Sequence, residues 1–128
     1  MFKDNDAFSG FSVRDMDAAE KFYGDTLGLK VERNSMGNLD ITLGNGARVM
    51  AYPKNNHEPA TFTILNFLVS DIDAAVDTLT AAGVQMERYD MPEMEADARG
   101  IVRNEYGPPI AWFKDPSDNI LAVIESDS

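Results

Sequence analysis

The chain has 128 residues, a hydrophobic fraction of 44%, a charged fraction of 26% and no cysteine. These values describe one globular domain that needs no disulfide, which is typical of a cytoplasmic protein. The net charge is −11, and so acidic a protein repels phosphate backbones, which argues against a nucleic-acid partner. We expect no membrane segment and no secretory signal, because no long apolar run is present. The charge leaves two interpretations open, a solvated surface or attraction of a cationic small molecule.

The first elements along the chain are a short strand and a helix. Residues 8–13 are expected to form a strand, with Ser9, Phe11 and Val13 on one face and Phe8, Gly10 and Ser12 on the other. Asp15 is a suitable N-cap for a helix that begins at Met16, because its carboxylate can accept hydrogen bonds from the first turn. Apolar residues then recur at helical spacing as far as Leu27, and Gly28 stands where helices commonly end in a left-handed conformation.

Three strands and a linker are expected to complete the first half. The predicted strands are residues 29–33, 39–43 and 48–52. A Gly-Asn-Gly sequence at residues 44–46 is typical of a tight hairpin turn between the last two strands. A polar linker follows at residues 54–60, so that the first module covers about residues 6–53.

The second half, about residues 61–126, repeats this order of elements. After its first strand, Asp71 is the expected cap of a second helix and Gly83 its end. The strands predicted after this helix are residues 85–88, 110–114 and 120–125. Residues 115–119 supply a turn between the last two strands. The long connection at residues 89–109 is expected to be a lid or a binding loop.

The two halves share sequence as well as element order. FSVRDMDAA at residues 11–19 recurs as FLVSDIDAA at residues 67–75, and VER at 31–33 recurs as MER at 86–88. Repeated blocks in the same order indicate a duplicated unit. We therefore predict an α+β fold of two tandem βαβββ modules, with eight strands, helices on one side and a cavity on the other.

Four stretches of the chain carry a family resemblance: VRDMDAAEKFYGDTLGLKV, FLVSDIDAAVDTL, IAWFKDPSDNI and LAVIE. With these stretches the chain resembles the glyoxalase/bleomycin-resistance/dioxygenase superfamily, also called the vicinal oxygen chelate superfamily. The resemblance covers nearly the whole chain. It implies a single domain over residues 1–128, with the two modules forming an open cup and the helices on its outer face. It also implies a homodimer as the common assembly.

The resemblance further implies where a metal would be held. In metal-using members the ligands come from the first strand of each module and from late strands. The corresponding positions here are Phe8, Ile64, Ala122 and either Val49 or Ala51. None of these side chains can donate a lone pair to a divalent cation. We therefore expect a member without the family metal ligands and without a cofactor.

Our preferred hypothesis is a metal-free protein that binds a small organic molecule, for instance a cationic antibiotic, in an apolar cup. The residues expected to contact this ligand are Phe8, Ser12, Ile64, Asn66, Trp112 and Ala122. The apolar members would line the cup, while Ser12 and Asn66 would orient the ligand. Two of these side chains also have a structural interpretation, since Trp112 could pack in the core and Asn66 could bond to neighbouring backbone.

Two other functions stay open. One is a lyase or isomerase that acts on a small carbonyl compound, for which a recognisable acid–base pair inside the cup is missing. The other is a regulatory member whose dimer surface matters more than its cavity. The sequence therefore leaves open whether the protein is an enzyme.

Several further polar residues have no assigned role. His57, the only histidine, is interpreted as an exposed loop residue. The acidic residues Asp90, Glu93, Glu95 and Asp97 of the long connection are either solvated or hold a cationic group of the ligand. Three more side chains could anchor an anion or donate a proton, and their strand face is not predicted: Arg48, Tyr52 and Tyr106.

Overall fold

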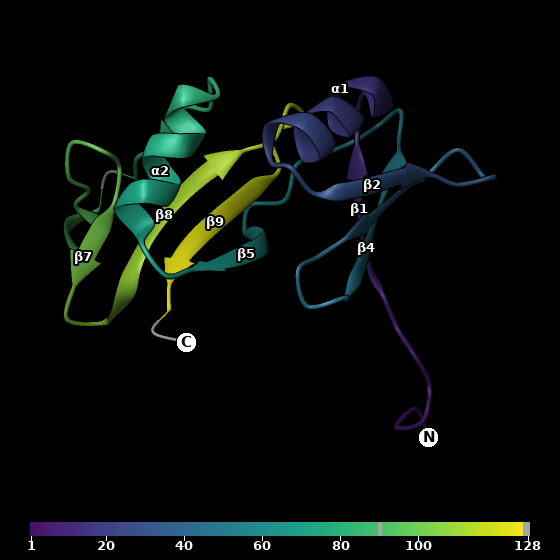
Figure 1. Ribbon diagram of the computed structural model, residues 1–128, viewed down its shortest axis with the longest axis horizontal. Helices are drawn as coiled ribbons and strands as arrows, with labels where there is room; N and C mark the ends of the chain where they lie inside the picture. The colour runs from purple at the N-terminus through teal and green to yellow at the C-terminus, as the bar shows by residue number, and fades with distance from the viewer. Residues whose placement is uncertain (90, 127–128) are drawn as a thin grey trace. The chain divides into compact units, whose positions relative to one another are not determined.

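The computed structural model describes residues 1–89 and 91–126, which divide into two compact units, Met1–Glu58 and Pro59–Ser128. Each unit contains one sheet with a helical segment on one of its faces (Figure 1). Each unit is described by itself. No helix in these two stretches of chain is both long and apolar enough to cross a membrane.

The first unit is a four-stranded sheet in the order β1-β4-β3-β2. Its strands are β1 (Ser9–Val13), β2 (Lys30–Arg33), β3 (Leu39–Thr42) and β4 (Arg48–Pro53). The edge strand β1 is parallel to its neighbour β4, and the other neighbouring pairs are antiparallel. This arrangement confirms the predicted strand–helix–three-strand order of the first module.

The helical segment of this unit is not one regular helix. Asp15 caps it as predicted, because its Oδ1 accepts hydrogen bonds from the N–H groups of Asp17 and Ala18 at 2.9 and 3.2 Å. Helix α1 (Met16–Glu20) then widens into the π-helix η1 (Lys21–Thr26). A β-carbon at Gly24 would lie 2.8 Å from Cγ2 of Val31, so the bare glycine allows the segment to approach β2 closely.

Every second residue of the first sheet faces this helical segment. The buried side chains on that face come from three strands and are Phe11, Val13, Leu39, Ile41, Val49 and Ala51. Tyr23 of η1 is fully buried, and its ring lies 5.6 Å from the ring of Phe11. The opposite face of the sheet is therefore the one left for other contacts.

The second unit is a five-stranded sheet with the path β5-β9-β8-β6 and with β7 also paired to β8. Its strands are β5 (Thr63–Val69), β6 (Met86–Glu87), β7 (Val102–Asn104), β8 (Gly107–Lys114) and β9 (Ile120–Glu125). The pair β5 and β9 is parallel, and the other pairs are antiparallel. The order again matches the prediction, with one added strand.

Helix α2 (Ile72–Ala81) covers one face of this sheet, against β9 and β8. Asp71 caps it by accepting from the N–H of Ala74 at 3.1 Å, and Glu125 Oε2 accepts from the N–H of Ile72 at the same distance. The helix buries Ile72, Val76 and Leu79, and the sheet buries Phe113, Leu121 and Val123. The face of the sheet away from α2 carries the alternate residues of each strand.

The long connection is more ordered than a loop. It contains the short 3-10 helix η2 (Pro92–Met94) and strand β7, and β8 begins at Gly107 instead of residue 110. The described residues therefore form nine strands, where eight were predicted. The predicted turn at residues 115–119 is present and is held by Asp115, whose carboxylate accepts from the N–H groups of Ser117 and Asn119 and from the Asn119 side chain.

Candidate functional site

Three of the predicted ligand-binding residues lie side by side on the face of the second sheet away from α2. Asn66 on β5 pairs with Ala122 on β9, and Ala122 pairs with Trp112 on β8. Neighbours in sequence, such as Leu121 and Phe113, point to the opposite face and are buried. We call the face with Asn66, Ala122 and Trp112 the open face of the second sheet.

The indole ring of Trp112 crosses the middle strand of this row. Its Nε1–H donates a hydrogen bond to Thr63 Oγ1 at 3.2 Å, although β9 lies between β8 and β5. The side chain therefore crosses β9 beside Ala122, its cross-strand partner, which is 0% exposed. Only a small side chain leaves room for the ring at this position. Ala122 thus supports the indole and has no surface of its own to offer a ligand.

Thr63 was missed by sequence reasoning because of an irregularity in β5. The register shifts between Thr63, which pairs with Ile120, and Leu65, which pairs with Leu121. Ile64 is the extra residue of this bulge, so the alternation of faces does not extend to it from Asn66. The open face accordingly presents Thr63, and Ile64 is half-buried. Asn66 is exposed.

Tyr89 is a second residue of the open face that was not predicted. Its ring meets the ring of Trp112 edge-on, with centroids 5.3 Å apart. Burial, helped by the negative charge of Glu87, raises the pKa of the Tyr89 phenol above its usual value, although Lys114 opposes the shift. The phenol is therefore a hydrogen-bond donor at neutral pH. The sequence offered only a tyrosine at the start of a long loop.

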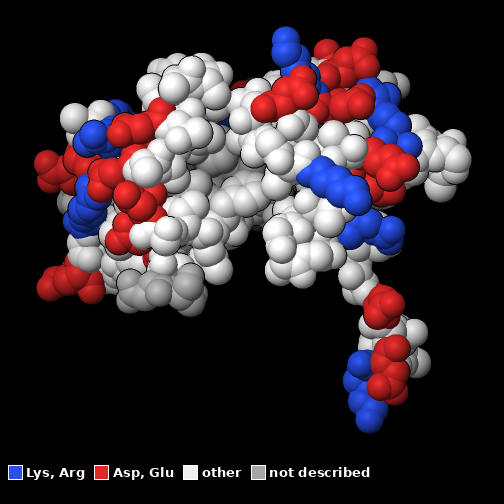
Figure 2. All heavy atoms as spheres, in the orientation of Figure 1, with Lys and Arg blue, Asp and Glu red and all other residues white. Residues whose placement is uncertain are grey.

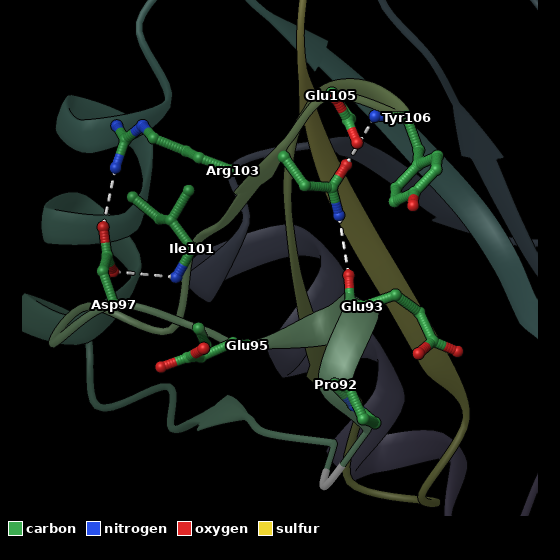
Figure 3. Close-up of a pocket in the computed structure, with 10 residues that line it drawn as sticks. Pro92, Glu93, Glu95, Asp97, Ile101, Arg103, Glu105 and Tyr106 are labelled. Carbon is green, nitrogen blue, oxygen red and sulfur yellow. Dashed lines mark hydrogen bonds and ion pairs between the residues drawn. The ribbon is translucent and has the colours of Figure 1, made fainter.

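The connection after Tyr89 encloses two hollows. The larger, of about 830 Å³, is shown in Figure 3 and is lined by Pro92, Glu93, Glu95, Ala96, Asp97, Ile101, Arg103, Asn104, Glu105 and Tyr106. The smaller, of about 500 Å³, is lined by Arg88, Tyr89, Met91, Pro92, Glu95 and Ala96. Glu95 lines both hollows, so the two hollows are neighbours. Tyr89, whose ring contacts Trp112, lines the smaller one.

The acidic residues of the connection differ in what they contact. Asp97 is engaged by Arg103 at 2.6 Å, and its carboxylate also accepts from the N–H groups of Arg99 and Ile101. Partial burial raises the pKa of Asp97, but these hydrogen bonds and the two arginines outweigh it and hold the pKa below its usual value. Glu93 and Glu95 make no ion pair with any described residue. Asp90 lies outside the described residues.

Arginines fasten the segment from Asp97 to Arg103 onto α2. Arg103 contacts Asp73 at 2.7 Å, and Arg99 contacts Asp77 at 2.9 Å. In Figure 2 positive and negative side chains accordingly alternate over the part of the surface that carries β7. These arginines therefore pair with aspartates. They form no ion pair with Glu93, Glu95 or Glu105, which line the larger hollow.

The open face of the first sheet carries the other two predicted ligand contacts. Phe8 precedes β1 and is 53% exposed, and the Arg48 guanidinium lies 4.7 Å from the centre of its ring. Ser12 pairs with Tyr52, which places both on the face away from Phe11. The structure thus assigns Arg48 and Tyr52, whose faces were not predicted, to the open face.

Two predictions about this unit are wrong. His57 is half-buried instead of exposed, and its Nδ1 lies 2.6 Å from Ser12 Oγ. Val49 and Ala51 are both buried on the helix side, so neither is the counterpart of Ala122. That counterpart is Met50, which pairs with a β1 residue in the same way that Ala122 pairs with β5.

The positions that the resemblance assigns to the family metal ligands are Phe8, Ile64 and Ala122, with Met50 as the counterpart of Ala122. They do not fit a divalent cation, because a phenyl ring, a thioether and two aliphatic groups supply no oxygen or nitrogen donor. Within residues 1–89 and 91–126, no three His, Cys, Asp or Glu side chains come together as a potential metal site.

Comparison with known proteins agrees with this architecture. The family model described as Glyoxalase/Bleomycin resistance protein/Dioxygenase superfamily matches residues 8–123. A search of curated protein sequences found no match. Among solved structures, a member of the same superfamily from Sphaerobacter thermophilus is 23% identical, with a TM-score of 0.74 over 98% of this chain and 100% of the other.

Two further solved structures have the same fold. TnmS3, an antibiotic binding protein from a Streptomyces species, is 22% identical, with a TM-score of 0.66 over 95% of this chain and 97% of its own. The fosfomycin resistance protein FosX from Listeria monocytogenes is 12% identical, with a TM-score of 0.71 over 95% of this chain and 93% of its own. At these identities the likeness concerns the fold alone.

Proposed function

Because the chain belongs to the Glyoxalase/Bleomycin resistance protein/Dioxygenase superfamily, we propose that it binds a small organic molecule on the open face of the second sheet, without a metal ion. One observation carries this proposal. The indole of Trp112 reaches across β9 to a hydrogen bond with Thr63, and the ring of Tyr89 meets it at 87°. This arrangement offers a planar apolar surface with polar groups at its margin, as ligand sites generally do.

The polar groups at this margin would orient the ligand. The phenol of Tyr89 donates, the hydroxyl of Thr63 can accept, and the exposed amide of Asn66 does both. These groups surround the indole, whereas the metal-ligand positions carry apolar side chains. Within the first unit, we propose Phe8 and Ser12 as residues that contact a ligand.

The ligand is proposed to be an aromatic cation. Glu93, Glu95 and Glu105 line the larger hollow without an ion pair among the described residues, and Glu95 also lines the hollow that contains Tyr89. A protonated amine would find a carboxylate partner there, while the planar part of the molecule stacks on Trp112. The net charge of −11 would also raise the rate of encounter with a cation. TnmS3, which shares the fold, is an antibiotic binding protein.

The enzyme alternative rests on Tyr89. A phenol kept protonated beside an apolar surface could act as a proton donor to a carbonyl compound, in a lyase or isomerase. Our proposal expects no turnover of methylglyoxal–thiol adducts by chelator-treated protein. Catalysis that is lost in Tyr89→Phe would favour the enzyme alternative.

A thermal-shift experiment on chelator-treated protein tests the proposed function. The probes are bleomycin, a basic glycopeptide, and the planar aromatic cation ethidium. A probe at 100 times its Kd should stabilise the protein by about 2.7 kcal/mol, and Trp112→Phe should reduce this effect. Phe2→Leu, at an exposed aromatic residue outside the site, is the matched control and should bind like the parent protein.

Two results of this experiment would contradict the proposal. One is that neither probe stabilises the chelator-treated protein. The other is that stabilisation appears only after Zn²⁺, Ni²⁺ or Mn²⁺ has been added back.

A further inference from the structure

Ser12 and His57 form a close side-chain pair on the open face of the first sheet. Ser12 lies near the end of β1, on the face opposite the buried side chain of Val13. The chain then returns to this point after β4, because the N–H of Lys54 donates to Val13 O at 3.0 Å and the N–H of His57 donates to Lys54 O at 3.1 Å. This turn positions the imidazole so that Nδ1 lies 2.6 Å from Ser12 Oγ.

The pair has the geometry of a nucleophile and its general base. When the imidazole carries its proton on Nε2, Nδ1 is the acceptor and the Ser12 hydroxyl donates to it. A separation of 2.6 Å lies within the range at which a histidine takes the proton of an attacking hydroxyl. Both side chains are half-buried, which limits competition from bulk water.

Gly10 and Tyr52 lie beside Ser12 on the open face of the first sheet. Gly10 lies two residues earlier on the same face and is exposed. A β-carbon there would lie 3.5 Å from Met50 O and 3.8 Å from Cε1 of Tyr52. On this face the strand therefore presents bare backbone at Gly10, with the Tyr52 ring against it and Ser12 as the next side chain.

We propose that Ser12 is a nucleophile activated by His57 and that the protein hydrolyses small activated esters on the first sheet. Ser12 Oγ attacks the carbonyl carbon while its proton passes to His57 Nδ1. The ester C–O bond breaks, and the leaving group departs with that proton. Water, deprotonated at the same nitrogen, then cleaves the acyl-serine, which releases the carboxylic acid and restores the Ser12 hydroxyl.

The first test measures activation of the side chain at position 12 without any turnover. The chain has no cysteine, so Ser12→Cys carries the only thiol, and an unperturbed thiol has a pKa of about 8.5. With His57 as its base, this thiol should react with iodoacetamide at pH 7 about tenfold faster than the thiol of Ser9→Cys, on the same strand. The advantage should disappear in Ser12→Cys combined with His57→Gln. Equal rates in the three proteins would overturn the proposal.

The second test measures the reaction itself with 4-nitrophenyl acetate. We expect a burst of 4-nitrophenol and a mass increase of one acetyl group that peptide mapping places on Ser12. Ser12→Ala and His57→Gln should lose the burst at least tenfold, while Ser9→Ala should keep it. Circular dichroism confirms that each variant is folded. An acetyl group on lysine alone, or a burst unchanged in Ser12→Ala, would show that the pair is only a structural hydrogen bond.

Discussion

Ala122→Leu should displace the indole of Trp112 from the second sheet. Trp112 pairs with Ala122 and crosses β9 to reach Thr63, and Ala122 has no exposed surface. A leucine there adds three carbon atoms beneath a ring that already contacts the strand. The ring must then move, and its hydrogen bond to Thr63 is lost.

The size of this effect follows from the two contacts that change. Overpacking of a filled position costs about 1–3 kcal/mol, and the lost hydrogen bond costs about 0.5–1.5 kcal/mol. Together they predict a loss of roughly 1.5–4.5 kcal/mol in the free energy of unfolding. With a urea dependence of about 2 kcal/mol per molar, the unfolding midpoint should fall by roughly 1–2 M.

Tryptophan fluorescence is the assay, because Trp112 is the only tryptophan. Its emission should move to longer wavelength in native Ala122→Leu, as the indole becomes more exposed. Ala111→Leu is the control, since Ala111 is equally buried but lies on the face toward α2. That variant should lose stability and keep the parent emission. Parent-like emission and an unchanged midpoint in Ala122→Leu would refute the placement of the ring over Ala122.

Three further predictions concern the second unit. Asp115→Ala should lower the free energy of unfolding by at least about 2 kcal/mol, measured in urea, because buried N–H donors lose their acceptor. The free energy of unfolding should fall in acid as Asp97, whose pKa is lowered, becomes protonated. This loss should be smaller in Arg103→Gln, which lacks the ion pair with Asp97. An equal acid dependence in the parent protein and in Arg103→Gln would argue against the ion pair. Glu87→Gln should bring the pKa of Tyr89 closer to its usual value. The tyrosine phenolate should then quench the tryptophan fluorescence at a lower pH than in the parent protein. An unchanged midpoint of this pH titration would show that Glu87 does not raise the pKa.

Local signals in the sequence predicted most of the fold. Asp15 and Asp71 could be recognised as helix caps from their own chemistry, and the glycines at 28 and 83 do adopt positive φ angles of 72° and 91°. The repeat then placed the same elements in both halves. Such features depend on residues that are close in sequence, so they can be recognised without knowledge of tertiary packing.

The site was predicted less completely because it depends on register and on contacts between distant segments. Because of the bulge at Ile64, Thr63 takes the place of Ile64 on the open face of the second sheet. No local residue pattern predicts that shift in register. The approach of His57 to Ser12 depends on a turn that folds back on β1. Tyr89 gains its role only because its ring meets Trp112, which comes from another strand.

The single indole N–H resonance of Trp112 tests the proposed ligand site most directly. We expect this signal to shift as chelator-treated protein is titrated with bleomycin or ethidium, and to saturate at the Kd measured by thermal shift. Binding that leaves the indole signal unmoved, or a shift that requires an added metal ion, would contradict a metal-free site around Trp112.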